Sequence, residues 1–252
     1  MHWAILSGIE GNVEAYEAVL KDIQRQKQQV AVLFVLGDFV GLKGDNQATI
    51  ERLRSPRPGE LPPQVCVGWW EEQCFSLHGL SGSLDAPELM EQEGGEGVRA
   101  LWNSVPREAV LWMRSLHFGF HELDCLLIHG STLSYADELT PETPAIQLCD
   151  RLIRADANRL FCGRSGLTFE CEVFPHQLTS SVTTLDGAQE PVDQGKTSRR
   201  VVGVGSVGRT QGLATYTMYH SGSDRVTFKT VRYGQAKGFA PTSARSSVKS
   251  RK

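Results

Sequence analysis

The sequence predicts an α/β fold whose first strands are buried and parallel. A strand at residues 3–6, a helix at 13–29 and a strand at 30–36 follow one another directly. Such a strand–helix–strand unit places its two strands parallel, with a right-handed crossover. The second strand, Val-Ala-Val-Leu-Phe-Val-Leu, is continuously apolar and rich in β-branched residues, which is typical of a strand buried on both faces. The start of the chain therefore indicates the α/β class.

The remaining elements follow in chain order. The helix at 13–29 carries apolar side chains at helical spacing and charges on its other face. A later helix is expected to have Thr143 as its N-cap, to begin at Pro144 and to run to about residue 155. Two more helices are predicted at 46–54 and at 86–114, the latter interrupted at Gly94-Gly95 and at Pro106. A short strand is expected at 65–67. Further strands are predicted at 123–128, 160–162, 169–173, 200–204, 213–220 and 225–233, the last three alternating like antiparallel strands.

These elements form one predicted domain over residues 1–235, with a variable loop at about 175–200. The loop is polar and rich in turn residues. Residues 236–252 carry Lys and Arg among Ser, Ala and Gly without an acid, which predicts a disordered basic tail.

The composition is that of an ordinary soluble protein of 252 residues. A net charge of −3 gives no overall attraction to nucleic acid or anionic lipid, and no apolar run is long enough to span a membrane. The first residues, Met1–Leu6, lack the basic region of a signal peptide. The six cysteines form no C-x-x-C pair, so we expect a reducing, cytoplasmic setting.

Polar residues stand at the ends of several predicted strands. The carboxyl ends of parallel strands meet at one edge of a sheet, where α/β folds bind ligands. A pair of metal ions needs a bridging carboxylate together with His and Asn ligands, so this pattern favours a two-metal phosphoesterase site. The strand-end residues are Ser7–Asn12, Asp38, Ser83–Asp85, His129 and Arg164.

A glycine motif at Gly203–Gly208 has the G-x-G-x-x-G spacing of dinucleotide-binding loops. The residues after it, 210–219, have a strand pattern, so no helix N-terminus follows to hold a pyrophosphate. We therefore dismiss dinucleotide binding.

Six segments together resemble the motifs of the calcineurin-like metallophosphoesterases, in particular their small bacterial members. The resemblance covers most of residues 1–233. It implies a four-layer αββα sandwich, in which two mixed β-sheets stack face to face with helices outside. The segments are Ser7–Asn12, similar to S-D-I-H-G-N; 36–41, similar to L-G-D-x-V-G; 81–85, similar to x-G-N-H-D; 128–131, similar to V-H-G-S; 161–166, similar to x-x-G-H-T-H; and 205–208, similar to G-S-V-G.

Departures from these motifs remove most of the implied metal ligands. Only Asp38 and His129 remain at liganding positions. Glycine and leucine have no donor atom for a metal, and an arginine cannot be deprotonated and repels a cation. The replacements are Gly8 for the first Asp ligand, Glu10 for a His, Ser83 for the Asn ligand, Leu84 for the catalytic His, and Arg164 and Gly166 for the last two His.

The sequence therefore predicts a pseudoenzyme, a catalytically impaired metallophosphoesterase homologue that acts as a ligand-binding, regulatory or scaffold protein without a cofactor. Arg164 stands where a metal's charge is expected, so it can hold the phosphate of a phosphorylated small molecule. The favoured interpretation is that Arg164 forms an internal ion pair with Asp38 or Glu10 and does not hold a phosphate. The residual pocket comprises Glu10, Asn12, Asp38, Ser83, Asp85, His129 and Arg164.

Two alternatives stay open. The chain can be an active phosphatase or phosphodiesterase in which Glu10, Asp38 and His129 hold a single Mn, Fe or Zn ion. It can also bind a protein partner through Trp69 and Trp70 if these are exposed, whereas buried they are simply core. Asn12, Asp85 and Ser131 are expected to cap loops whatever the function.

Overall fold

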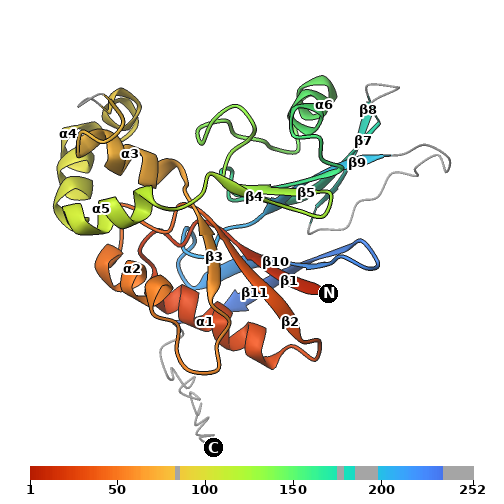
Figure 1. The fold of residues 1–252 in the computed structure, drawn as a ribbon, viewed down its shortest axis with the longest axis horizontal. Coiled ribbons are helices and arrows are strands. Elements are labelled where there is room, and N and C mark those ends of the chain that lie inside the picture. Colours follow the sequence, from red (N-terminus) through yellow and green to blue (C-terminus); the bar gives the residue numbers. More distant parts are fainter. Residues whose placement is uncertain (83–85, 175–178, 185–197, 235–252) are drawn as a thin grey trace, which may run out of the picture.

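The computed structural model describes residues 1–82, 86–174, 179–184 and 198–234. Two mixed β-sheets stack face to face, with α1 and α2 on the outer side of one and α6 on the outer side of the other (Figure 1). This is the predicted αββα arrangement. The predicted tail, residues 236–252, lies outside the described residues, as does most of the predicted loop at 175–200.

The first sheet has the order β11-β10-β1-β2-β3. Strands β1, β2 and β3 run parallel, and β10 and β11 are antiparallel to their neighbours. The parallel part therefore places the ends of three strands at one edge. The strands are β1 (His2–Leu6), β2 (Val30–Leu36), β3 (Pro63–Cys66), β10 (Leu213–His220) and β11 (Arg225–Arg232).

The second sheet has the order β4-β5-β6-β9-β7-β8. Strands β5, β6 and β9 run parallel, and β4, β7 and β8 pair antiparallel. The predicted grouping of 200–204 with the antiparallel strands at 213–220 and 225–233 is wrong. Strand β9 (200–204) lies in a different sheet from β10 (213–220). The strands are β4 (Gly119–Glu122), β5 (Cys125–Ile128), β6 (Arg159–Cys162), β7 (Thr168–Phe174), β8 (Thr179–Thr184) and β9 (Arg199–Val204).

Strand β1 shows why the core has separate layers. Trp3 and Ile5 pack between the two sheets, and the alternate residues Ala4 and Leu6 pack toward α1. Because both faces of the strand are buried, its sequence is continuously apolar and lacks the alternation of a half-exposed strand. A further apolar layer lies under α6, where Leu148 and Leu152 are buried.

The predicted helices are present in the predicted order, several of their ends differ, and α3 was not predicted. Helix α1 ends at Arg25, four residues earlier than expected. Thr143 is not the N-cap of α6, since Pro144 occupies that position and its fixed φ leads into a helix that begins at Ala145. The helices are α1 (Val13–Arg25), α2 (Asn46–Arg54), α3 (Trp69–Leu77), α4 (Pro87–Ser104), α5 (Arg107–Arg114) and α6 (Ala145–Arg154).

The expected interruptions at 94–95 and 106 are present. Gly94 has a φ of 67° inside α4, and Pro106 is the N-cap of α5. Two strands were not predicted. Strand β4 follows α5 closely, and β8 lies within the segment expected to be a loop.

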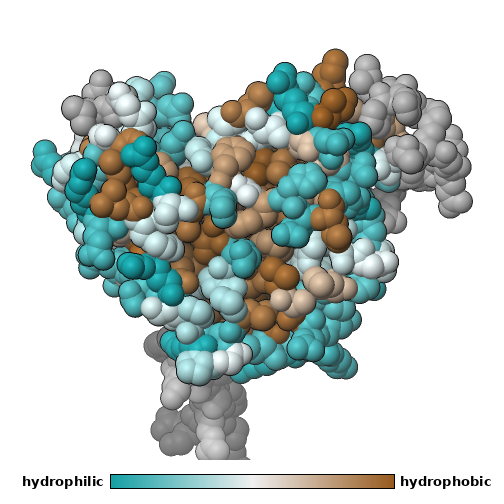
Figure 2. Space-filling model, in the orientation of Figure 1, coloured by the Kyte–Doolittle hydropathy of each residue, from teal (hydrophilic) through white to brown (hydrophobic). Residues whose placement is uncertain are grey.

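The surface view shows a notch between the α3–α5 side of the molecule and the α6 side (Figure 2). In the described part of the chain, no helix combines the length and apolar character that a membrane crossing requires.

Candidate functional site

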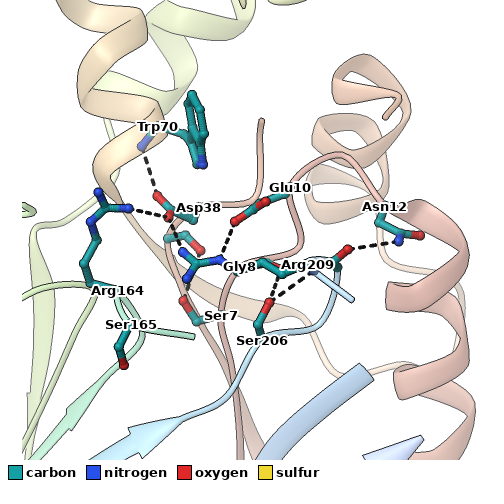
Figure 3. Close-up of polar contacts among 12 residues, drawn as sticks. Ser7, Gly8, Glu10, Asn12, Asp38, Trp70, Arg164, Ser165, Ser206 and Arg209 are labelled. Atoms are coloured by element: carbon teal, nitrogen blue, oxygen red, sulfur yellow. Dashed lines mark hydrogen bonds and ion pairs between the residues drawn. The ribbon is translucent and has the colours of Figure 1, made fainter. Parts of the chain in front are cut away.

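The loops that follow β1, β2, β5, β6 and β9 converge at one edge of the sandwich. Main-chain hydrogen bonds connect these loops. The Gly8 nitrogen donates to the Gly37 carbonyl oxygen, the Val207 nitrogen donates to the Ser7 carbonyl oxygen, and the Arg164 nitrogen donates to the His129 carbonyl oxygen. The strand-end residues that the sequence singled out therefore come together in part. Glu10, Asp38, His129 and Arg164 share one cluster (Figure 3).

Asp38 is the centre of this cluster and is fully buried. Its Oδ1 atom accepts a hydrogen bond of 2.9 Å from the Trp70 nitrogen. Its Oδ2 atom faces His129, Arg164 and Arg209. Burial alone would raise the pKa of this carboxyl, but His129, Arg209 and the Trp70 N–H hold it down, at about 2. Asp38 is therefore an ionised carboxylate inside the protein.

His129 is the first neighbour of the Asp38 carboxylate. The Leu36 carbonyl oxygen can only accept, so Nδ1 of His129, 2.8 Å away, carries a hydrogen. The Nε2 atom lies 3.2 Å from Oδ2 of Asp38, and both side chains are buried. The Leu36 carbonyl thus orients the ring so that Nε2 faces Asp38.

Arg209 is a second neighbour of the Asp38 carboxylate, and it was not identified from the sequence. Its Nε donates to Oε1 of Glu10 over 2.6 Å and its Nη2 to Oδ2 of Asp38 over 3.2 Å (Figure 3). Burial raises the pKa of Glu10, and Arg209 opposes that effect. The available signal is the position of this arginine directly after the G-S-V-G turn at 205–208.

The guanidinium of Arg209 lies against two positions at which the resemblance expects metal ligands. A Cβ atom at Gly8 would lie 3.6 Å from Arg209 Nε, and one at Gly166 would lie 2.6 Å from Arg209 Nη1. Arg209 therefore occupies the space that a side chain at Gly166 would need, and it contacts the Gly8 position.

Arg164 forms the ion pair with Asp38 that the sequence favours, and this pair is long. Its Nη1 atom is 3.9 Å from Oδ2 of Asp38, which is beyond hydrogen-bond distance. The guanidinium carbon lies 4.5 Å from the centre of the Trp69 ring, so the charge sits over an aromatic face. The Nε atom is buried and has no hydrogen-bond partner in the described part of the chain. Arg209 makes the shorter contacts with Asp38 and Glu10.

Glu71 shapes the loop that carries Asp38, and it too was missed. Its buried carboxylate accepts hydrogen bonds from the nitrogens of Asp38 at 2.8 Å, Phe39 and Val40 at 3.0 Å, and Gly68 at 2.7 Å. Burial and the nearby Asp38 raise the pKa of Glu71 to about 7, against the effect of these N–H donors. Its sequence signal was weak, because 69–72 had no clear secondary-structure pattern.

The third strand-end motif was misplaced at 81–85. That segment follows α3 rather than a strand, and Ser83, Leu84 and Asp85 lie outside the described residues. The strand beside β2 is β3, and the residues after it are Gly68-Trp69-Trp70-Glu71. This stretch therefore has the strand-end place that was predicted for 81–85, and it contains Trp69 and Trp70. Both are buried, which corrects the idea that they anchor a partner.

Asn12 and Ser131 have the expected capping roles and do not join the cluster. The Asn12 side-chain oxygen accepts from the Ala15 nitrogen at the start of α1, and its amide donates to the Tyr233 hydroxyl. The Ser131 hydroxyl accepts from the Leu133 nitrogen.

Solved structures with this architecture were found by comparison. A metallophosphoesterase from Sphaerobacter thermophilus is 20% identical, with a TM-score of 0.64 over 93% of this chain and 90% of its own. A hypothetical protein from Pyrococcus horikoshii OT3 is 17% identical, with a TM-score of 0.68 over 93% of this chain and 89% of its own. The chain has the metallophosphoesterase fold. No protein-family model matches the sequence, and no curated protein matches it.

The residues of this metallophosphoesterase fold do not fit a pair of metal ions. No group of three His, Cys, Asp or Glu side chains suited to a metal occurs in the described part of the chain. Two arginines stand beside Asp38 instead, and Gly8 and Gly166 supply no donor atom. No metal-dependent step can be derived from this donor set.

Proposed function

We propose that this protein of the metallophosphoesterase fold is a non-hydrolytic, metal-independent binding protein. One observation carries the proposal: the Arg209 guanidinium pairs with both Asp38 and Glu10 and lies against Gly8 and Gly166. A positive charge of the chain itself thereby neutralises the carboxylates that a cation would need.

Hydrolysis by this fold would need a water whose pKa is lowered by bound metal. Arg209 and Arg164 both repel an incoming cation, and displacing Arg209 would leave a buried charge unpaired. Activation of water is therefore not expected at this site.

The proposed ligand is a phosphorylated small molecule, and Arg164 is its proposed contact. The guanidinium is positioned over Trp69 and its Nε has no partner in the described part of the chain, so donors remain for an oxyanion. This geometry supports binding through charge-assisted hydrogen bonds without cleavage.

Metal content and hydrolysis test the proposal together. Elemental mass spectrometry of the purified protein is expected to show no stoichiometric Mn, Fe or Zn, and bis(p-nitrophenyl) phosphate and p-nitrophenyl phosphate should stay intact with added Mn²⁺. Asp38→Ala is the control. Near-stoichiometric metal that disappears in Asp38→Ala, with hydrolysis above background, would overturn the proposal.

The second candidate is an enzyme with a single metal ion held by Glu10, Asp38 and His129. The 3.2 Å approach of His129 Nε2 to Asp38 favours it, since two of the three side chains already face each other. Arg209→Ala separates the two functions. In a binding protein this variant should gain weak Mn²⁺ binding that the wild type lacks, because the carboxylates are released. In a mononuclear enzyme the wild type already binds Mn²⁺.

Phosphate binding is tested through tryptophan fluorescence, because Trp69 lies under Arg164. Inorganic phosphate should change the emission of the wild type saturably and that of Arg164→Gln much less. Arg99→Gln, an exposed charge on α4, should behave as the wild type. An equal response of all three proteins would contradict the proposed contact.

A further inference from the structure

A second concentration of positive charge lies at the other end of the first sheet. A cavity of about 200 Å³ there is lined by His2 of β1, His220 of β10, and Arg225 and Lys229 of β11. Strand β1 runs from His2 to Leu6, and the candidate site begins at the next residue, Ser7. The cavity therefore lies at the opposite end of β1 from the cluster around Asp38.

Strand register places the basic side chains in one row. His2 is directly opposite His220, and His220 is directly opposite Arg225. The imidazole ring centres of the two histidines are 4.3 Å apart. Lys229 is four residues along β11 from Arg225, so it projects from the same face. Neighbouring strands are about 4.8 Å apart, so the row across three strands is roughly 10 Å long.

No carboxylate of the described chain neutralises this row. Neither Arg225 nor Lys229 forms an ion pair or a side-chain hydrogen bond within the described residues. The nearest acid in sequence, Asp224, is engaged by Arg159, Arg200 and the Tyr219 hydroxyl. Burial, the adjacent His220 and the N-terminal amino group lower the pKa of His2, which agrees with a site short of negative charge.

We infer that this cavity binds a small oxyanion of the diphosphate class. Arginine matches phosphate oxygens with its fork of donors, and imidazole and ammonium groups add further donors. Arg225 and Lys229 line the cavity from separate positions of β11, so a ligand with two linked phosphate groups can contact both, whereas a single phosphate group offers fewer oxygens. The chain as a whole has a net charge of −3, so the attraction is local and favours a compact ligand over a long polyanion. This inference does not depend on the function proposed for the Asp38 cluster.

Inorganic pyrophosphate is the probe, and the imidazole resonances of His2 and His220 report binding by NMR. Saturable shifts are expected in the wild type. The double variant Arg225→Gln/Lys229→Gln should weaken the affinity by roughly tenfold or more, because it removes charge-assisted contacts. Arg232→Gln is the matched control: it removes one charge from the same strand on the other face, and should retain an affinity within about twofold.

Ionic strength is held constant, and sulfate and orthophosphate are titrated in parallel. Equal shifts with sulfate and pyrophosphate would overturn the inference, as would equal losses in Arg232→Gln and the double variant. Arg164→Gln should keep the wild-type response. A loss there would place pyrophosphate at the Asp38 cluster and refute the second site, whereas retention leaves the two sites independent. Thermal unfolding of every variant checks that it is folded.

Discussion

The two ends of the first sheet differ in whether their positively charged side chains are paired with a carboxylate. At one end, His129, Arg209 and Arg164 all face the buried carboxylate of Asp38. At the other end, Arg225 and Lys229 line a cavity and meet no carboxylate in the described residues. Burial explains the difference. A buried charge without a partner costs several kcal/mol, while an exposed one remains solvated and costs little. The buried cluster must therefore contain its own counter-ions, whereas the basic row at the other end of the sheet can bind an anion from solution.

The largest effect should come from removing the counter-ion of the buried cluster. Asp38→Asn keeps the shape of the side chain and tolerates the φ of 51°, but leaves His129 and Arg209 without their shared carboxylate. We expect the free energy of unfolding to fall by about 3–5 kcal/mol in urea titrations. Asp45→Asn, an exposed change at the N-cap of α2, should alter it by less than about 0.5 kcal/mol. Equal losses would show that the charge of Asp38 is not needed for stability.

The next effect concerns the carboxylate that holds the Asp38 loop. Glu71→Gln retains one oxygen and turns an amide NH₂ toward two of the four main-chain N–H donors. Loss of these hydrogen bonds in the interior should lower the free energy of unfolding by about 2–4 kcal/mol. Glu72→Gln is the matched control on the next, partly exposed residue of α3. Hydrogen exchange of the Phe39 and Val40 amides should accelerate only in Glu71→Gln. Unchanged exchange would contradict the role of Glu71.

Acid should weaken the buried cluster. The folded-state pKa of Asp38, about 2, is below its ordinary value of 3.8, so its ionisation stabilises the fold above about pH 4. That contribution, about 2 kcal/mol, is lost as the pH falls from about 4 toward 2. Unfolding free energies measured across this range should decline more steeply for the wild type than for Asp38→Asn. Parallel curves would show that another group is responsible.

The smallest effect is expected at the basic row. Arg225 is exposed and unpaired within the described chain, so Arg225→Gln removes repulsion and no attraction. The free energy of unfolding should stay within about 0.5 kcal/mol of the wild type, or rise slightly. A loss of more than about 1 kcal/mol would mean that Arg225 already has a partner, and the contrast between the two ends would fail.

Local sequence patterns determined the elements and the strand ends of this protein. The apolar run of β2 and the helical spacing in α1 each need only neighbours along the chain, because their backbone hydrogen bonds and buried faces are set within a few residues. The proximity of Asp38 and His129 was predicted from a single sheet edge, but their strands β2 and β5 lie in different sheets, so the stacking of the two sheets brings these residues together.

Tertiary structure alone decided what surrounds Asp38. Arg209 is 199 residues from Glu10 and 171 from Asp38, and no periodicity relates such distant positions. Gly68–Glu71 lie beside Asp38 because β3 pairs with β2, and the basic row exists because β10 and β11 extend the same sheet. Strand pairing brings these residues together across the whole chain, and burial then selects which charges must be matched.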